Sequence, residues 1–470
     1  MESMVLELGY ALDTFYFLMC TALVMWMAAG FAMLEAGLVR AKNTVEILNK
    51  NALLYGVACI VYLAVGYNVM YPANPISSVI PGIDFLLGAD NSTESVIAGG
   101  DDAPYYSSMA DFIFQAVFAA ATMSIVSGAV AERMKLWPFL IFAVFMVAVI
   151  YPVEGYWKWG GGFLDQLGFQ DFAGSVVVHM AGAAAALAAV ILVGPRKGKY
   201  GKNGEVRAIP GANLPMATLG MFILWMGWFG FNGGSELKIA NVEEANAVAK
   251  IFVNTNAAAA AGMVVAALFA RFLFGKTDLT MTINGALAGL VAITAEPLQP
   301  SAGLASLIGA VGGLVVVASV LALDKLKLDD PVGAISVHGS AGIWGIFAVL
   351  LSNDDATFTG QLIGTVATFA WMFAASMVVL LVIKAIMGLR VSEEEELEGM
   401  DVHECGMQAY PEFGPAHSSM GLATDRARPT WNHRVKARWH LSRVPPLPNK
   451  QSPPEPKGPS GPFFGLGKPC

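Results

Sequence analysis

The stretch IGTVATFAWMFAASMVVLLVIKAI, residues 363–386, decides the class of fold. It is apolar over more than the roughly 20 residues that a helix needs to cross a bilayer, and Lys384 is its one charged residue. Residues 12–34 and 136–150 are also apolar and poor in charge. Of the whole chain 56% is hydrophobic and 14% charged, whereas soluble domains carry about a quarter charged residues. The sequence therefore predicts an all-α polytopic membrane protein.

Hydropathy divides the chain into eleven apolar spans. The first residues carry Glu2 and Glu7 rather than Lys or Arg, which is not typical of a cleaved signal peptide, so the first span is expected to stay in the membrane. We expect transmembrane helices at residues 10–34, 50–70, 110–131, 136–153, 172–194, 213–232, 247–274, 280–297, 302–323, 333–352 and 361–389.

The basic residues of the loops fall mainly on one side of this set of spans. The opposite loops contain Lys158, Lys238 and Lys250, and the long loop 71–109 has acidic residues but no Lys or Arg. Because Lys and Arg accumulate on the cytoplasmic side, we expect the N-terminus outside and the C-terminus in the cytoplasm. The alternate, basic loops hold Arg40, Lys42, Lys50, Arg133, Lys135, Arg196, Lys197, Lys199, Lys202, Arg207, Arg271, Lys276, Lys325 and Lys327.

Composition also divides the chain along its length. Residues 1–389 form the predicted transmembrane domain, and residues 390–420 a cytoplasmic regulatory segment. Residues 421–470 are rich in Pro, Arg and Lys and poor in aliphatic residues, so we expect a disordered tail. The four cysteines lack metal-ligand spacing, and no nucleotide loop or catalytic triad is evident, so we expect no enzyme, cofactor, metal or nucleic-acid partner.

Two of the six histidines, His179 and His338, lie inside predicted spans, where ionisable residues are rare and functional. Asp171 precedes the first by eight residues and Asp330 the second, and each aspartate suits the start of a helix, where it supports the structure by capping free N–H groups. Eight residues rise about 12 Å, so entry from opposite faces of a core about 30 Å thick brings both histidines near the midplane. Spans one to five and six to ten would then be an inverted repeat, followed by one extra helix.

We infer that the two imidazoles meet at the centre of the membrane. Two other interpretations stay open at this point. The histidines could be unrelated core residues, each satisfied by a backbone carbonyl, or they could ligate a haem or a metal as a pair, although no further ligands or cofactor motif support this.

Aromatic residues gather on the predicted outer side. Residues 225–235 read WMGWFGFNGGS, Trp159 follows the fourth span, and Phe118 lies in the outer half of the third. An aromatic belt at the membrane interface is one explanation. The other is a cage in which aromatic faces attract a small cation, Ser235 adds an oxygen acceptor, and phenylalanine rings form a constriction below. Spacing alone does not separate the two.

Several stretches resemble the Amt/Mep/Rh ammonium transporter family, and its Amt branch most closely. The resemblance covers about residues 10–412 and rests on EAGLVRAKN (35–43), GAVAERM (128–134), DFAGSVVVH (171–179), GWFGFNGGS (227–235), DDPVGAISVHG (329–339) and EGMDVHECGMQAY (398–410). It implies eleven helices per subunit and a homotrimer in the plasma (inner) membrane, with one pore in each subunit.

The resemblance also implies a role for individual residues. An ammonium recruitment site would comprise Trp159 and Ser235 with Phe118 beside it, and Phe118 and Phe231 would form a gate. His179 and His338 would be the pore histidines, Trp228 would line the pore, and Asp171 would support the vestibule without touching substrate. A PII-type signalling protein is a possible cytoplasmic partner. The threonine that plant members phosphorylate is missing at residues 401–403, which puts that form of regulation in doubt.

The expected function is therefore ammonium transport across a lipid bilayer. Ammonium would be recruited outside, lose its proton and cross as ammonia, with or without a separately relayed proton. Two alternatives are an ammonium sensor and a neutral-gas channel of the Rh type.

Overall fold

The computed structural model describes residues 2–100 and 103–411 of the 470-residue chain. The predicted tail 421–470 and the end of the predicted segment 390–420 lie outside these residues. Within them the regular structure is helical, apart from two isolated β-bridges. The helices are α1 Glu2–Leu38, η1 Ala41–Asn43, α2 Thr44–Val61, η2 Tyr62–Gly66, α3 Tyr67–Met70, α4 Thr93–Ile97, α5 Ser108–Ala129, α6 Leu136–Phe145, η3 Met146–Ile150, α7 Tyr151–Lys158, α8 Phe163–Gln166, η4 Ser175–Met180, α9 Ala181–Val193, α10 Leu214–Gly234, α11 Val242–Phe274, α12 Leu279–Thr294, α13 Ala302–Lys325, η5 Ile335–Ser340, α14 Ala341–Ala348, η6 Val349–Leu351, α15 Phe358–Met387, α16 Glu393–Glu398 and α17 Met400–Cys405.

The prediction of an all-α membrane fold is confirmed. In the described part of the chain, nine helical segments are long and apolar enough to cross a bilayer, and two shorter apolar helices cover Leu279–Thr294 and Ile335–Leu351. All eleven predicted ranges fall on these segments. The number of spans that cross the bilayer, the sidedness of the two ends and the inverted repeat stay predictions.

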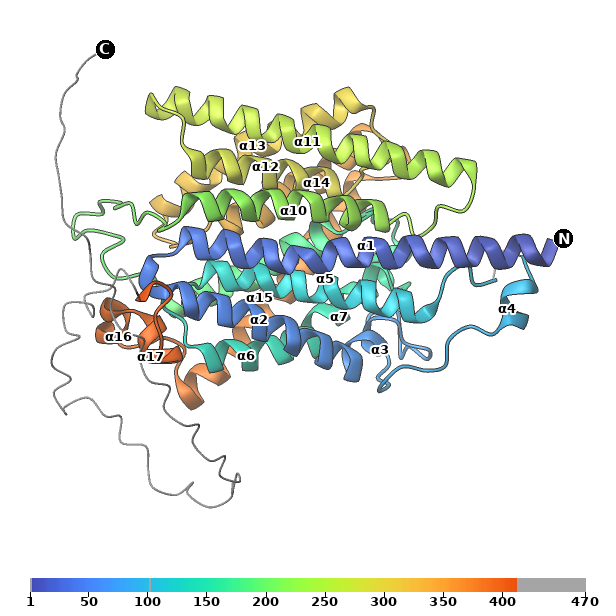
Figure 1. Ribbon diagram of the computed structural model, residues 1–470, viewed down its shortest axis with the longest axis horizontal. Coiled ribbons are helices and arrows are strands. Elements are labelled where there is room, and N and C mark those ends of the chain that lie inside the picture. The colour runs from blue at the N-terminus through green and yellow to red at the C-terminus, as the bar shows by residue number, and fades with distance from the viewer. Residues whose placement is uncertain (1, 101–102, 412–470) are drawn as a thin grey trace, which may run out of the picture. The chain divides into compact units, whose positions relative to one another are not determined.

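The first helix is longer than the predicted span 10–34. α1 covers Glu2–Leu38, and 37 residues of α-helix measure about 55 Å, well beyond a hydrocarbon core of about 30 Å. Hydropathy marks only the apolar part of a helix, so the polar first turns around Glu7 were missed. Figure 1 shows the beginning of α1 and the short helix α4 at one end of the bundle, with α16 and α17 at the opposite end.

The long helices pack against one another in several pairs. α1 lies along α10 and also contacts α5, while α11 packs against α12 and α13 (Figure 1). Side-chain caps fix where several of them begin: Ser107 accepts backbone N–H groups at the start of α5, Asn213 at α10 and Asp278 at α12. Such caps supply partners to helix N–H groups that would otherwise have none.

The segment after α15 packs back onto the loops that carry the basic residues. The N–H of Lys135 donates to the carbonyl of Leu389 at 2.9 Å, and the N–H of Val391 donates to the backbone carbonyl of Arg133 at 3.1 Å. The N–H of Glu46 in turn donates to the carboxylate of Asp401 at 2.9 Å. The described part of the predicted segment 390–420 is therefore attached to the loop between α5 and α6 and to the start of α2.

Candidate functional site

Two segments of matching design carry the membrane histidines. Asp171 accepts four backbone N–H groups, from Gly174 to Val177, at 2.8–3.2 Å. Asp330 accepts three, from Gly333 to Ile335, at 2.7–3.1 Å. In each segment the glycine three residues after the aspartate has a positive φ, 104° at Gly174 and 80° at Gly333, a conformation that only glycine adopts without strain. The chain thereby turns sharply around each carboxylate before it enters the membrane helix.

Each histidine lies on a π-helical turn that follows this cap. η4 carries His179 and continues into α9, and η5 carries His338 and continues into α14. A π turn holds one residue more than an α turn and re-aims the side chains on it. Propensity gives no signal for such turns, so the sequence indicated an ordinary helix at both places.

The structure brings the two imidazoles together. Nδ1 of His179 and Nδ1 of His338 are 3.2 Å apart, and the ring centroids are 5.1 Å apart at an interplanar angle of 25°. The rings are 1% and 5% exposed. A hydrogen bond between two Nδ1 atoms needs one donor and one acceptor, so the acceptor ring is in the neutral form protonated at Nε2. Nε2 of His179 has no partner among the described residues.

A stacked phenylalanine pair covers the His179 side of this pair. The rings of Phe118 and Phe231 stack with centroids 4.0 Å apart and an interplanar angle of 21°, and both are buried. Phe231 also stacks on His179 at 5.1 Å. The two phenylalanines come from α5 and α10, so the packing of these helices sets the distance between the rings.

Beyond this pair lies a cavity of about 290 Å³, which we call the aromatic cavity. The predicted residues Trp159, Ser235 and Phe118 all line it, so they share one site although they come from different helices. Trp159 is held by its Nε1–H, which donates to the carbonyl of Asp171 at 3.2 Å, and its ring is 6.1 Å from that of Phe118. The full lining is Tyr67, Tyr71, Tyr106, Asp111, Phe114, Gln115, Phe118, Trp159, Phe172, Ser235 and Leu237.

Trp228 lies against the histidine pair. Its ring stacks on His179 at 5.0 Å, and its Nε1–H donates to the hydroxyl of Thr294 at 2.8 Å. The side chain is fully buried. This hydrogen bond satisfies the indole N–H, so the part of Trp228 that meets the histidine is the face of the ring.

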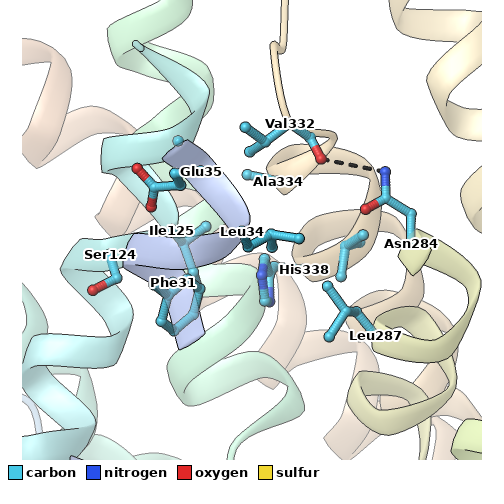
Figure 2. A pocket seen from close by; sticks show the side chains of 12 residues that line it. Phe31, Leu34, Glu35, Ser124, Ile125, Asn284, Leu287, Val332, Ala334 and His338 are labelled. Carbon is cyan, nitrogen blue, oxygen red and sulfur yellow. Dashed lines mark hydrogen bonds between the residues drawn. The ribbon is translucent and has the colours of Figure 1, made fainter. Parts of the chain in front are cut away.

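A small space of about 10 Å³, the histidine pocket, lies beside His338 and is large enough for about one water molecule. Figure 2 shows His338 between Phe31 on one side and Asn284 and Leu287 on the other. Asn284 donates through Nδ2 to the carbonyl of Val332 at 3.2 Å, and its Oδ1 has no partner among the described residues. The full lining is Phe31, Leu34, Glu35, Ser124, Ile125, Gly128, Asn284, Leu287, Val332, Ala334, Val337 and His338.

Asn284 and Val332 also line a larger space of about 610 Å³, the polar cavity. Arg196, Lys199 and Asp330 belong to its wall. Ring contacts and shared lining residues therefore link, in order, the aromatic cavity, the phenylalanine pair, the two histidines, the histidine pocket and the polar cavity. Sequence reasoning missed Phe31 and Asn284, because a phenylalanine in an apolar run and an asparagine near a helix start carry no distinguishing signal.

Charged residues near the polar cavity bind one another and hold the chain in place before Asp330. Arg196 binds the carboxylate of Asp329 through Nε and Nη2 at 2.8 and 2.9 Å, and Arg133 donates to the carbonyl of Asp329 at 2.6 Å. Burial alone would raise the pKa of Asp329, but hydrogen bonds and charge from Arg196, with the charge of Arg133, lower it to about 2. Asp329 is thus charged at neutral pH, and its two arginine partners anchor the chain directly before Asp330.

The chain is similar to known proteins over most of its length. The chain matches the Ammonium Transporter Family over residues 15–410. It is 41% identical to the ammonium transporter Amt2 of Archaeoglobus fulgidus, over 87% of this chain and 91% of that one. It is 40% identical to a putative ammonium transporter of Synechocystis, over 85% and 89%.

Solved structures share the fold. One described as a Sensor Amt Protein gives a TM-score of 0.78 at 33% identity and covers 85% of this chain and 99% of that one. Mep2 of Candida albicans gives 0.74 at 28% identity, over 87% and 94%.

Proposed function

The chain belongs to the Ammonium Transporter Family, and from this premise we propose that it recruits ammonium in the aromatic cavity, deprotonates it and conducts ammonia past the two histidines, with or without a separately relayed proton. The observation that carries the proposal is the Nδ1–Nδ1 contact of 3.2 Å between His179 and His338, closed off by the stacked pair Phe118 and Phe231. No separate haem or metal is part of this proposal.

Recruitment follows from the chemistry of the cavity wall. Ring faces attract a small cation by up to about 2 kcal/mol when the site is desolvated, and Trp159 and Phe118 supply such faces. Ser235 donates its hydroxyl hydrogen to the carbonyl of Phe231 at 2.8 Å, which leaves its oxygen lone pairs free to accept from ammonium. An aromatic belt facing lipid would not put these residues around one cavity.

The phenylalanine pair selects against charge. A hydrated ion cannot pass two stacked rings, and an unpaired charge in hydrocarbon costs from about 3 to more than 10 kcal/mol on disputed scales. Ammonium avoids most of this cost by leaving a proton behind, and potassium has no proton to leave. Selectivity then rests on proton loss and not on pore size alone.

The histidine pair offers hydrogen bonds to ammonia and a path for a proton. A proton taken up at Nε2 of His179 allows the Nδ1 hydrogen to pass to Nδ1 of His338, and Nε2 of His338 then releases one. Atoms and charge balance over this sequence, because one proton enters and one leaves. Imidazole exchanges protons near neutral pH, which suits this role.

We also carry the placement of the protein over from the resemblance. The aromatic cavity opens outside and the polar cavity to the cytoplasm, since Arg196 and Lys199 of the basic loops line the latter. The protein acts as a homotrimer in the plasma membrane, residues 1–389 transport, and residues 390–420 regulate, with a PII-type protein as their partner.

The test uses purified protein in proteoliposomes, with ammonium-evoked current and potassium flux measured together. We expect His338→Glu to let potassium through, because an acidic group beside Nδ1 of His179 stabilises a cation in the path. His179→Asp tests the same point from the other side, and His403→Gln, at an exposed histidine outside the path, is the control. If both pore variants keep current and potassium exclusion at the level of the control, the histidines do not do this work. A current that is absent at every pH would favour a neutral-gas channel.

A sensor is the second candidate, favoured by the likeness to the solved Sensor Amt Protein. A sensor that carries little ammonium would not restore growth to a strain that lacks ammonium uptake. We expect this chain to restore it, and His179→Asp to serve as the comparison in the same strain.

A further inference from the structure

The carboxylate of Asp111 lies in the wall of the aromatic cavity. Asp111 belongs to α5, whereas Trp159 and Ser235 come from other segments of the chain. It lies in the first turn of α5, where an acidic residue also interacts well with the helix dipole. A role at the helix start would be a sufficient reason for its presence if both of its oxygens were used for structure.

Only one oxygen of Asp111 is used in this way. The hydroxyl of Tyr67 donates to Oδ2 at 2.6 Å. Tyr67 is itself held between the rings of Tyr71 at 5.3 Å and Phe112 at 5.6 Å, so the carboxylate is fixed in one orientation. Among the described residues no group donates to Oδ1, and no Lys or Arg forms an ion pair with the carboxylate.

A second free acceptor lies one turn deeper on the same helix face. Gln115 follows Asp111 by four residues, lines the same cavity and is 7% exposed, and its Oε1 has no hydrogen-bond partner among the described residues. Phe118 follows three residues later and begins the closed part of the path. Positions i, i+4 and i+7 share one face of a helix, so α5 presents a charged acceptor, a neutral acceptor and then a ring.

We propose that Asp111 is the ammonium-attracting carboxylate of the aromatic cavity, which binds the cation first and passes it by way of Gln115 to the rings at the phenylalanine pair. This proposal rests on the proposed transport of ammonium. A singly charged cation with four N–H donors fits one carboxylate oxygen, one amide oxygen and the surrounding tyrosine and tryptophan rings. A divalent metal would require more oxygen ligands than the cavity wall supplies.

The variant Asp111→Asn tests the proposal in proteoliposomes by current as a function of ammonium concentration. Asparagine keeps the shape of the side chain and an oxygen for Tyr67, but removes the charge. We expect the half-saturating concentration to rise roughly 5- to 10-fold, as for the loss of one opposite charge in a partly buried site, with the maximal current within about twofold of the wild type. Asp111→Glu restores a carboxylate and is expected to recover most of the affinity.

Asp84→Asn is the matched control, because Asp84 is an exposed acid of the loop before α4 and does not line the cavity. Its effect, if any, should vanish at high salt, whereas that of Asp111→Asn should persist, since a charge inside a cavity is screened less. An unchanged half-saturating concentration in correctly folded Asp111→Asn, or an equal shift in Asp84→Asn, overturns the proposal. A wild-type protein that carries no ammonium overturns the proposed function instead, so the two failures are distinguishable.

Discussion

Asp171 and Asp330 begin two segments that share an aspartate cap, a glycine of positive φ and a histidine on a π turn, yet the two segments are held in place by different means. The η4 segment is fixed by its own cap and by neutral contacts: the N–H groups of Phe172 and Ala173 donate to the carbonyls of Ala295 and Thr294. The η5 segment follows Asp329, which is bound by two arginines.

The surroundings of the two histidines differ in the same sense. His179 is enclosed by the rings of Trp228 and Phe231, while His338 borders the histidine pocket and, through Asn284, the polar cavity. The same local sequence design thus supports a closed, ring-lined half and an open, charge-anchored half. The comparison teaches that the aspartate cap orients the turn that carries each histidine. The neighbouring elements decide whether the imidazole is enclosed by rings or borders a cavity.

The strongest way to break the comparison is Asp171→Ala. The substitution leaves four buried N–H groups without their acceptor, and we expect a loss of about 4 kcal/mol in the free energy of unfolding, or failure to obtain folded protein. Asp330→Ala removes the acceptor of three N–H groups beside a large polar cavity, where water can accept some of these hydrogen bonds. We therefore expect a smaller loss, about 2 kcal/mol in the free energy of unfolding. Thermal unfolding in detergent, followed by size-exclusion fluorescence, measures both. Equal losses would mean that the two caps do not differ in burial as described.

Asp329→Asn sharpens the contrast from the other side. It keeps the shape of the residue but removes the charge that Arg196 binds through two nitrogens, and we expect a loss of about 3 kcal/mol. Glu132 stays within 3.4 Å of Arg196 and limits the effect. The same melting assay applies, with Asp165→Asn as control, since Asp165 forms a surface pair with Lys158. A melting temperature equal to that of the control would refute the view that charge anchors this half.

Trp228→Phe probes the neutral contacts of the ring-lined half. It keeps an aromatic face against His179 but removes the N–H donor to Thr294. We expect the free energy of unfolding to fall by about 1 to 2 kcal/mol. Trp225→Phe on the same helix is the control, because Trp225 is half-buried and packs on Phe222. Should both variants melt together, the hydrogen bond to Thr294 contributes nothing measurable.

The smallest expected effect is that of mild acid on the charge-anchored half. Since the pKa of Asp329 is lowered to about 2 in the folded protein, its contribution is complete above the unfolded value of about 3.9 and is lost as the pH falls from about 4 towards 2. Stability from this pair should not change between about pH 8 and pH 5. Melting curves over this range and below it, compared with Asp329→Asn, check the prediction. A gain in stability as the pH falls, seen in the wild type and absent from the variant, would contradict the sign.

Much of the fold could be predicted from the sequence, because apolar runs and basic loops are recognised from the types of residue alone. The pairing of His179 with His338 followed from the matched spacing behind two aspartates. The π turns, the neighbourhood of Phe31 and the free oxygen of Asn284 depend on packing between distant helices, and single-chain periodicity does not report that. Asp111 could have been noticed as an acid at the edge of an apolar span, but its partner Tyr67 lies 44 residues away.

The contact between the two histidines joins the same atom of each ring. Exchanging which nitrogen holds the hydrogen leaves the contact itself unchanged, so any preference between the two states comes from the different surroundings of the two rings. Under the proposed transport, the direction of net flux follows the concentrations of ammonium and ammonia on the two sides, and a cell that must keep ammonium inside needs a valve elsewhere in the protein or on a partner.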